Sequence, residues 1–125
     1  MKRPQLLICD DETGIRESLK LILEENYDLV YAGNGQEALE QTKQLQPDLL
    51  IMDIKMPFLN GLDALIPIRA QNPTLKILIV TGYESSDVAA QAIQRGANDY
   101  LTKPFTREEV WEKVAQLLGE QPQTS

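Results

Sequence analysis

Histidine is absent from this 125-residue chain, and cysteine occurs only once. Without histidine the chain cannot build a Ser-His-Asp or Cys-His catalytic set or an imidazole metal site. It also cannot carry a phosphohistidine, so any such phosphoryl donor must be another molecule. The single cysteine, Cys9, excludes an internal disulfide. Because Cys9 lies in an apolar run, we expect it to be a small buried side chain.

Basic residues are few, and long hydrophobic runs are absent. The 12 Lys and Arg residues against 19 Asp and Glu residues give a net charge of −7. This balance disfavours direct binding to nucleic acid or to an anionic membrane surface, because phosphate contacts need basic patches. The first apolar run is too short for a signal-peptide core, and no stretch is long enough to cross a bilayer. We therefore expect a cytoplasmic protein with no direct membrane or nucleic-acid contact.

Short apolar segments alternate with amphipathic ones along the chain. The length, with 42% hydrophobic and 25% charged residues, is typical of one globular domain with a substantial core. Short continuous apolar runs indicate parallel strands that are buried on both faces. The predicted strands are Gln5–Cys9, Tyr27–Ala32, Leu49–Asp53, Lys76–Thr81 and Asp99–Thr102. Each is followed by a predicted helix, so the sequence predicts an open α/β sheet with helices on both faces.

Capping residues mark the ends of the predicted helices. Asn34 with Glu37, and Thr106 with Glu109, have the spacing of a capping box. The third helix, about residues 62–71, contains a proline that should kink it or fray its start. The buried stripes are predicted at Ile15, Leu19, Ile22 and Leu23, at Ala38, Leu39, Thr42 and Leu45, and at Val110, Val114, Leu117 and Leu118, with Gly96 and Gly119 closing two helices. We assign residues 1–119 to the domain and 120–125 to a flexible tail or the start of a linker.

Polar side chains stand where four of the predicted strands end. Asp10 and Asp11 follow the first strand, Asp53 ends the third, Thr81 ends the fourth and Lys103 follows the fifth. In an open parallel sheet these ends form one edge, where ligands bind. Carboxylates that meet there repel each other unless a cation compensates, and Mg²⁺, or alternatively Mn²⁺, suits oxygen ligands. The alternative, that Asp10, Asp11 and Glu12 only form an acidic helix N-terminus, explains neither Asp53 nor Lys103. We therefore predict a site for a divalent metal ion and a phosphoryl group.

With these residues in this order, the chain resembles the receiver domain of response regulators in two-component signalling, of the chemotaxis-regulator type. The resemblance runs from Leu6 to Leu118. Its matching residues are Asp10-Asp11, Asp53, Met56-Pro57, Gly61, Thr81, the segment Gly96–Tyr100 and Lys103-Pro104-Phe105. Each motif is weak alone, whereas the ordered set is specific. The resemblance implies a flavodoxin-like, doubly wound sheet of five parallel strands in the order 2-1-3-4-5 with five helices.

The resemblance also implies a role for the residues at the sheet edge. Asp53 would be the phosphoacceptor, a carboxylate nucleophile that becomes an aspartyl phosphate. Asp11, Asp53 and the backbone carbonyl of Lys55 would bind Mg²⁺ directly, and Asp10 would hold it through water. Lys103 would pair with a phosphoryl oxygen, and its bond to the following proline is expected to be cis.

Four further side chains are expected to respond to the phosphoryl group. Thr81 would donate its hydroxyl to a phosphoryl oxygen. Tyr100 matches the switch aromatic that turns inward when Thr81 moves, although a half-buried strand aromatic would have the same sequence signature. Lys55 and Tyr83 would flank the approach of water to the phosphorus. We expect these two residues to lengthen the lifetime of the phosphorylated form.

The implied function is a phosphorylation-dependent signalling switch, which catalyses only its own phosphorylation and dephosphorylation. A histidine kinase or a histidine phosphotransfer protein would supply the phosphoryl group. The changed surface of the fourth helix, fifth strand and fifth helix would bind a downstream effector protein or effector domain, or a second phosphorylated copy of the chain.

Two other functions fit part of the sequence. Residues 33–38 match the G-x-G-x-x-A fingerprint of dinucleotide-binding proteins, with Asp53 near the expected downstream distance. That fingerprint belongs on the first βα turn, however, and here it follows the second predicted strand. A receiver that has lost phosphorylation and serves as a scaffold is disfavoured by the intact acidic set and lysine. The chain also lacks a G-x-x-x-x-G-K-[ST] loop, which disfavours a nucleotide triphosphatase.

Overall fold

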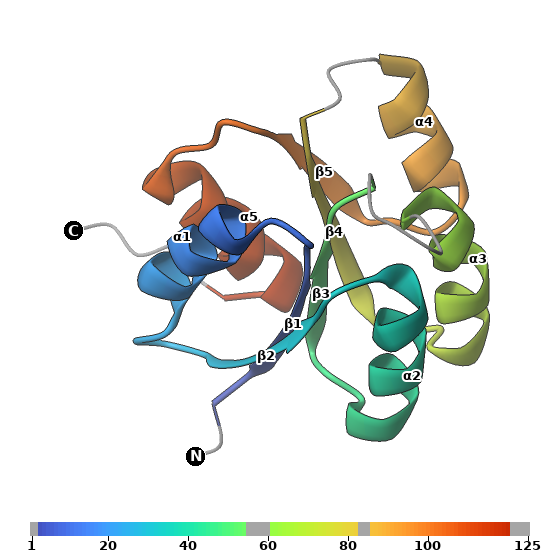
Figure 1. Ribbon diagram of the computed structural model, residues 1–125, viewed down its shortest axis with the longest axis horizontal. Helices are drawn as coiled ribbons and strands as arrows, with labels where there is room; N and C mark the ends of the chain where they lie inside the picture. The colour runs from blue at the N-terminus through green and yellow to red at the C-terminus, as the bar shows by residue number, and fades with distance from the viewer. Residues whose placement is uncertain (1–2, 55–60, 83–85, 121–125) are drawn as a thin grey trace.

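The computed structural model describes residues 3–54, 61–82 and 86–120 (Figure 1). Strands and helices alternate along this part of the chain: β1 Gln5–Cys9, α1 Thr13–Leu23, β2 Asp28–Ala32, α2 Gly35–Leu45, β3 Leu49–Met52, α3 Gly61–Gln71, β4 Lys76–Thr81, α4 Ser86–Gln94, β5 Asp99–Thr102 and α5 Arg107–Leu118. The bounds of β1, β4 and β5 are those that the sequence predicts. β2 starts one residue later than predicted and β3 ends one residue earlier. Within these residues, no helix combines the length and the apolar character that a bilayer crossing requires.

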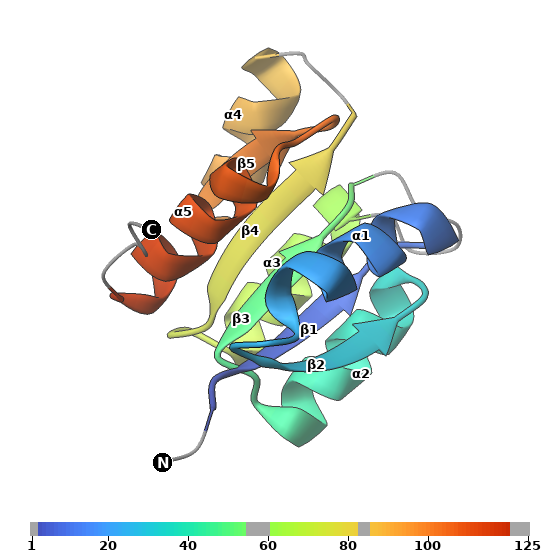
Figure 2. The same cartoon turned by 90° about the vertical axis from the view of Figure 1, so that its left-hand side faces the viewer.

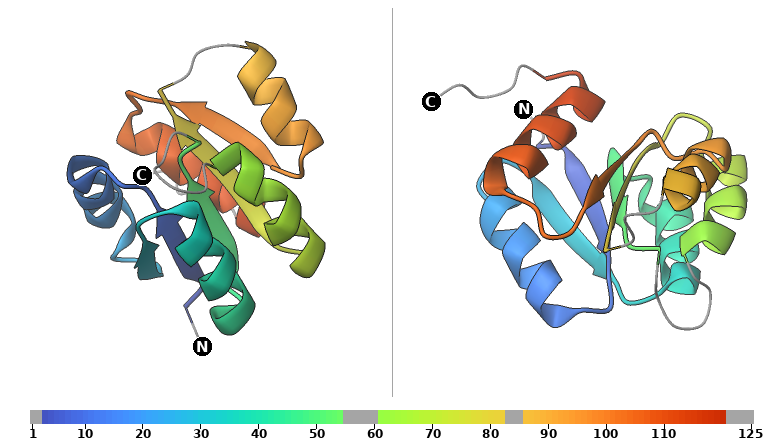
Figure 3. Two further views of the ribbon diagram at one scale, coloured as in Figure 1. Left: turned by 45° about the vertical axis from the view of Figure 1, so that its right-hand side comes forward. Right: turned by 90° about the horizontal axis from the view of Figure 1, so that it is seen from above.

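The strands form one parallel sheet in the order β2-β1-β3-β4-β5. This confirms the predicted α/β architecture and strand order. Figure 2 shows α1 and α5 on one face of the sheet, and Figure 3 shows α2, α3 and α4 on the other. In the pairing of β1 with β3, Cys9 lies opposite Met52. The residues that follow these two strands therefore leave the sheet side by side.

Alternating residues of each central strand fill two separate cores. In β1, Leu7 and Cys9 face the helices α2, α3 and α4, whereas Leu6 and Ile8 face α1 and α5. β3 and β4 divide their side chains in the same way, because successive side chains of a strand point to opposite faces. Both faces of these strands are thus buried, which explains why the strands read as continuous apolar runs.

The helices bury most of the predicted stripes, with one exception. Leu19 and Leu23 of α1 and Val110 and Val114 of α5 are buried as expected. Leu45, predicted to face the core, is instead 41% exposed. Leu45 is the last residue of α2 and lines a polar cleft at the edge of the sheet where the strands begin. At this position the helix no longer packs against the core. Pro67, the proline expected to kink the third helix or fray its start, lies inside α3, which continues on both sides of it.

The two predicted capping boxes differ in completeness. At the start of α5, the Thr106 hydroxyl accepts from the Glu109 N–H, and the Glu109 carboxylate accepts from the Thr106 N–H. At α2, the Asn34 side chain accepts from the Glu37 N–H at 2.9 Å. The Glu37 carboxylate, however, binds the Asn34 side-chain amide instead of the backbone N–H. The α2 box is therefore formed in one direction only.

We predict that Thr106→Ala lowers the free energy of unfolding by about 1 kcal/mol, because the first turn of α5 then loses its side-chain acceptor. Urea unfolding followed by circular dichroism measures this difference. Thr74→Ala, an exposed loop substitution, is the matched control and should leave the midpoint within error. Equal midpoints for both variants would show that the capping box adds nothing to stability.

Polar contacts lie at the edge of the sheet where the strands begin, and one of them reaches Glu120, just after α5. The Tyr27 hydroxyl donates to the Glu120 carboxylate at 2.7 Å, and Arg3 pairs with Asp28 at 3.5 Å. Burial and the Glu120 carboxylate raise the pKa of the Tyr27 phenol. Glu120, predicted as the first residue of a tail, therefore contacts the folded domain.

Candidate functional site

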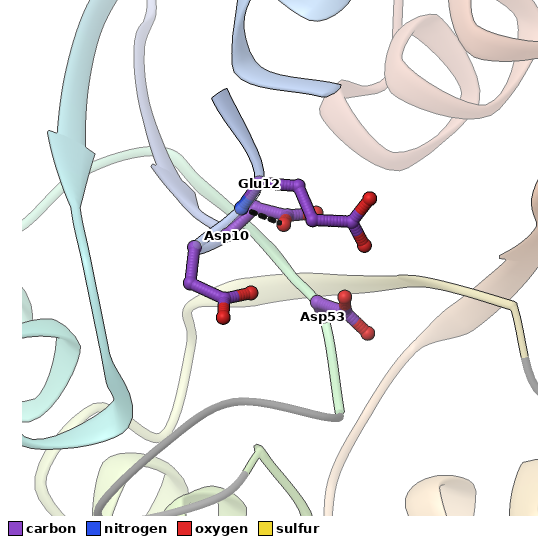
Figure 4. A group of neighbouring side chains, drawn as sticks. Asp10, Glu12 and Asp53 are labelled. Carbon is purple, nitrogen blue, oxygen red and sulfur yellow. Dashed lines mark hydrogen bonds between the residues drawn. The ribbon is translucent and has the colours of Figure 1, made fainter. Parts of the chain in front are cut away.

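The two buried acids of the site lie in the loops that follow β1 and β3. Asp10 and Asp53 are 2% and 3% exposed, and the Asp53 N–H donates to the Cys9 carbonyl at 3.0 Å. This bond continues the pairing of the two strands and fixes the start of both loops. The sheet thus places the two carboxylates close together, as Figure 4 shows.

Lys103 provides the cation of the site. Its backbone N–H donates to the Thr81 carbonyl at 2.8 Å, just beyond the pairing of β4 with β5, and its bond to Pro104 is cis as predicted. The Lys103 ammonium donates to Asp53 at 2.9 Å, to Asp10 at 3.0 Å and to Glu12 at 3.2 Å. One lysine thus bridges carboxylates from the loops after β1 and β3.

Burial and hydrogen bonding shift the pKa values of Asp10 and Lys103. Burial raises the pKa of the Asp10 carboxyl, although hydrogen bonds from the Glu12 N–H and from Lys103 oppose the shift. For Lys103, burial alone would lower the pKa, but hydrogen bonds to Asp53 and Asp10 outweigh it and raise the pKa above the usual value. The lysine is therefore a permanent cation at physiological pH. The neighbouring Cys9 thiol is buried, and burial together with the charge of Asp10 raises its pKa, so it stays protonated.

Four carboxylates gather within the range of one metal ion. Ligand oxygens of Asp10, Asp11, Glu12 and Asp53 lie within 4.8 Å of one another. We call these four residues the acidic cluster. The Asp11 side chain is exposed, and among residues 3–54, 61–82 and 86–120 no hydrogen bond or ion pair involves it. An all-oxygen, anionic donor set of this kind fits Mg²⁺ or Mn²⁺.

The remaining predicted residues differ in how far the structure describes them. Thr81 is 1% exposed and lies opposite Thr102 at the end of β4, so it belongs to the same edge of the sheet. Tyr100 is partly buried against the core under α2, α3 and α4. Lys55 and Tyr83 lie outside the described residues. The metal-binding carbonyl and the lifetime effect assigned to them stay predictions.

Glu12 is a site residue that the sequence argument did not single out. The sequence shows Asp10, Asp11 and Glu12 as consecutive acids, but the sequence argument gives a ligand role to the first two alone. In the structure the Glu12 carboxylate contacts Lys103. The sequence feature that could have identified Glu12 is its place directly after two proposed ligands, at the edge of the sheet where Lys103 is also predicted.

The glycine fingerprint of the dinucleotide alternative lies at the same edge of the sheet as the site, but on the strand beyond β1. Its turn joins β2 to α2, and β2 is the outermost strand of the sheet. A dinucleotide would instead be expected where the strand order reverses, between β1 and β3. Asp53, the acid that the fingerprint would use downstream, is paired with Lys103. The position of the turn therefore removes the main support for a dinucleotide-binding function.

Comparisons with known proteins agree with this geometry. A family model described as the response regulator receiver domain matches residues 6–115. Protein CcdB of Bacillus subtilis is 37% identical over 117 residues, which are 92% of this chain and 98% of that protein. The transcriptional regulatory protein LnrK of the same organism is 36% identical over 113 residues, 88% of this chain and 51% of LnrK. A crystal structure of a response regulator from Chloroflexus aurantiacus superposes with a TM-score of 0.89 at 34% identity, covering 95% of this chain and all of that one.

The chain belongs to the response regulator receiver domain family of two-component signalling. It spans about half the length of several curated relatives, such as LnrK and the response regulator MprA of Mycobacterium leprae. The receiver is therefore a signalling domain that, in those relatives, forms one part of a longer protein.

Proposed function

We propose that Asp53 accepts a phosphoryl group from a phosphohistidine of a histidine kinase or a histidine phosphotransfer protein in the cytoplasm. The observation that carries this proposal is the contact of a buried Asp53 carboxylate with Lys103 inside the acidic cluster. Since these 125 residues contain no histidine, the donor imidazole must lie outside them. The direct test is the gain of one phosphoryl group, measured by intact mass, after incubation with a small phosphodonor and Mg²⁺.

The transfer forms one bond and breaks another. A carboxylate oxygen of Asp53 attacks phosphorus, and a new P–O bond forms as the P–N bond to the donor imidazole breaks. The electron pair of that bond returns to the imidazole nitrogen, which then takes a proton. The Lys103 ammonium already lies 2.9 Å from Asp53, so it is placed to bind a phosphoryl oxygen.

The acidic cluster would hold Mg²⁺ during this transfer. Asp11 and Asp53 are the proposed direct ligands, together with the Lys55 carbonyl, and Asp10 would act through water. Both Asp10 carboxylate oxygens already accept hydrogen bonds, one from the Glu12 N–H and one from Lys103, which supports an indirect role. The bound ion would neutralise negative charge on the phosphoryl oxygens.

Phosphorylation would then change the surface for partners. The added charge would lie at the end of β3, beside the neighbouring strand β4 that ends at Thr81, and two strands away from Tyr100 on β5. We propose that Thr81 binds a phosphoryl oxygen and that Tyr100 turns further inward, which shifts the population between two states of α4, β5 and α5. A downstream effector protein or domain, or a second phosphorylated copy, would read this surface.

We predict that Tyr100 becomes more buried when a phosphoryl mimic binds. With beryllofluoride and Mg²⁺, the ring resonances of Tyr100 should shift, because the ring moves into the space that Thr81 leaves. The Tyr31 ring, on β2 at the far side of the sheet, is the internal reference. Unchanged Tyr100 resonances at saturating mimic would contradict a switch that uses this side chain.

A further inference from the structure

The Lys103 ammonium has three partners, and Glu12 is the one without an assigned role. It donates to Asp53 at 2.9 Å, to Asp10 at 3.0 Å and to Glu12 at 3.2 Å. A lysine ammonium has three N–H donors. All three are therefore used before any phosphoryl group arrives. A phosphoryl oxygen can bind Lys103 only if one of the three carboxylates gives up its hydrogen bond.

The three carboxylates differ in what release would cost. The side chains of Asp10 and Asp53 are 3% and 4% exposed, whereas the Glu12 side chain is 60% exposed. Release of a buried carboxylate would take the cationic partner away from a charge in a poorly solvated place, which is costly. Glu12 would return to water, and an exposed ion pair contributes little to stability. Glu12, which also has the longest of the three contacts, is thus the partner that leaves most readily.

Glu12 contacts the site through both its backbone and its side chain. Glu12 is the N-cap of α1, a position at which a side chain usually accepts a hydrogen bond from the first turn. Here the Glu12 side chain makes no such bond. Its N–H instead donates to Asp10 at 2.9 Å (Figure 4), and its carboxylate reaches Lys103. The backbone hydrogen bond to Asp10 therefore keeps Glu12 at the site even when its carboxylate no longer contacts Lys103.

We infer that Glu12 is a positioning residue that occupies the third N–H of Lys103 until a phosphoryl oxygen displaces it. The inference rests on the proposed phosphorylation of Asp53. No covalent bond to Glu12 is involved, since one hydrogen-bond acceptor replaces another on the same ammonium. Because the incoming phosphoryl group must compete with Glu12, this residue weakens the binding of the phosphodonor without changing the transfer step itself.

Two substitutions at Glu12 separate contact from charge. Glu12→Gln removes the negative charge, and Glu12→Asp keeps the charge on a side chain one methylene shorter, which withdraws it from Lys103. Phosphorylation is followed by intact mass over a range of acetyl phosphate concentrations at saturating Mg²⁺. In both variants we expect the half-saturating concentration to fall about two- to fivefold, the equivalent of one exposed ion pair.

Matched measurements decide between this role and others. Glu17→Gln makes the same charge change at an exposed position of α1 and should behave as the parent protein. If only Glu12→Gln lowers the half-saturating concentration, the effect is through-space charge and the inference is overturned. A severalfold loss of Mg²⁺ affinity in both Glu12 variants, with no gain for the donor, would make Glu12 a metal ligand and would also overturn it.

Failure of the inference is distinguishable from failure of the proposed function. If the parent protein is phosphorylated and neither Glu12 variant changes the half-saturating concentration, only the role of Glu12 is rejected. If the parent protein gains no phosphoryl group at any donor concentration, the proposed function fails and the inference fails with it.

Discussion

Asp53→Asn is expected to abolish phosphorylation, with no detectable mass gain after incubation with a small phosphodonor and Mg²⁺. The amide nitrogen and oxygen of asparagine do not act as phosphoryl acceptors, because the side chain has no anionic oxygen. Asp53 is the buried acid that Lys103 contacts at the end of β3. The substitution changes few atoms, so the fold should be retained, and circular dichroism checks this.

The control for this experiment is Asp28→Asn, which removes an exposed carboxylate at the opposite edge of the sheet. It should be phosphorylated as the parent protein is. Labelling of Asp53→Asn at the parent level would move the acceptor to another residue. Loss of labelling in both variants would point to a general effect of charge.

Asp11→Ala should weaken Mg²⁺ binding more than Asp10→Ala, for which we expect the loss of about 10- to 100-fold that is typical of an indirect partner of the metal. The difference follows from their partners in the structure. Asp11 is exposed and unpaired within the described residues, so its oxygens are available to an ion. Asp10 is already bound by Lys103 and by the Glu12 N–H. Calorimetric titration with Mg²⁺ measures both affinities.

The same two variants should differ in metal-free stability. Asp11→Ala removes one repelling charge from the acidic cluster and should slightly raise the urea midpoint without Mg²⁺. Asp10→Ala removes a partner of Lys103 and should not raise it. Glu17→Ala, on the exposed face of α1, serves as the control for charge alone. Parent-like Mg²⁺ affinity in Asp11→Ala would exclude Asp11 as a direct ligand.

The sequence alone predicts most of the fold because its central strands are buried on both faces. Continuous apolar runs such as Lys76–Thr81 mark strands in this setting, and the observed β4 has these bounds. The strand order does not follow from the pattern, since apolar runs carry no information on which strands are neighbours. The order was expected from the family resemblance, and the pairing of the strands confirms it.

The features that the sequence predicts wrongly or not at all have local physical causes. Leu45 fits the periodicity of α2, but periodicity does not say where the helix passes the edge of the core. Helix α2 ends at Leu45, and its C-cap residue Gln46 adopts a left-handed conformation with φ of 48°, so no glycine signals the end. At the site, the sequence predicts which charges meet at the edge of the sheet. It does not predict that Lys103 divides its three donors among Asp10, Glu12 and Asp53, because that depends on side-chain conformations.

The contact between Tyr27 and Glu120 has a practical consequence for experiments on this domain. It places residue 120 beside the start of the sheet, together with Arg3 and Asp28, whereas the acidic cluster lies where β1 and β3 end. A biosensor chip or a fluorescent dye attached near residue 3 or residue 120 would therefore sit at the opposite pole from the phosphorylation site. Immobilised in this way, the domain presents Asp53 to a soluble phosphodonor partner without steric hindrance from the support.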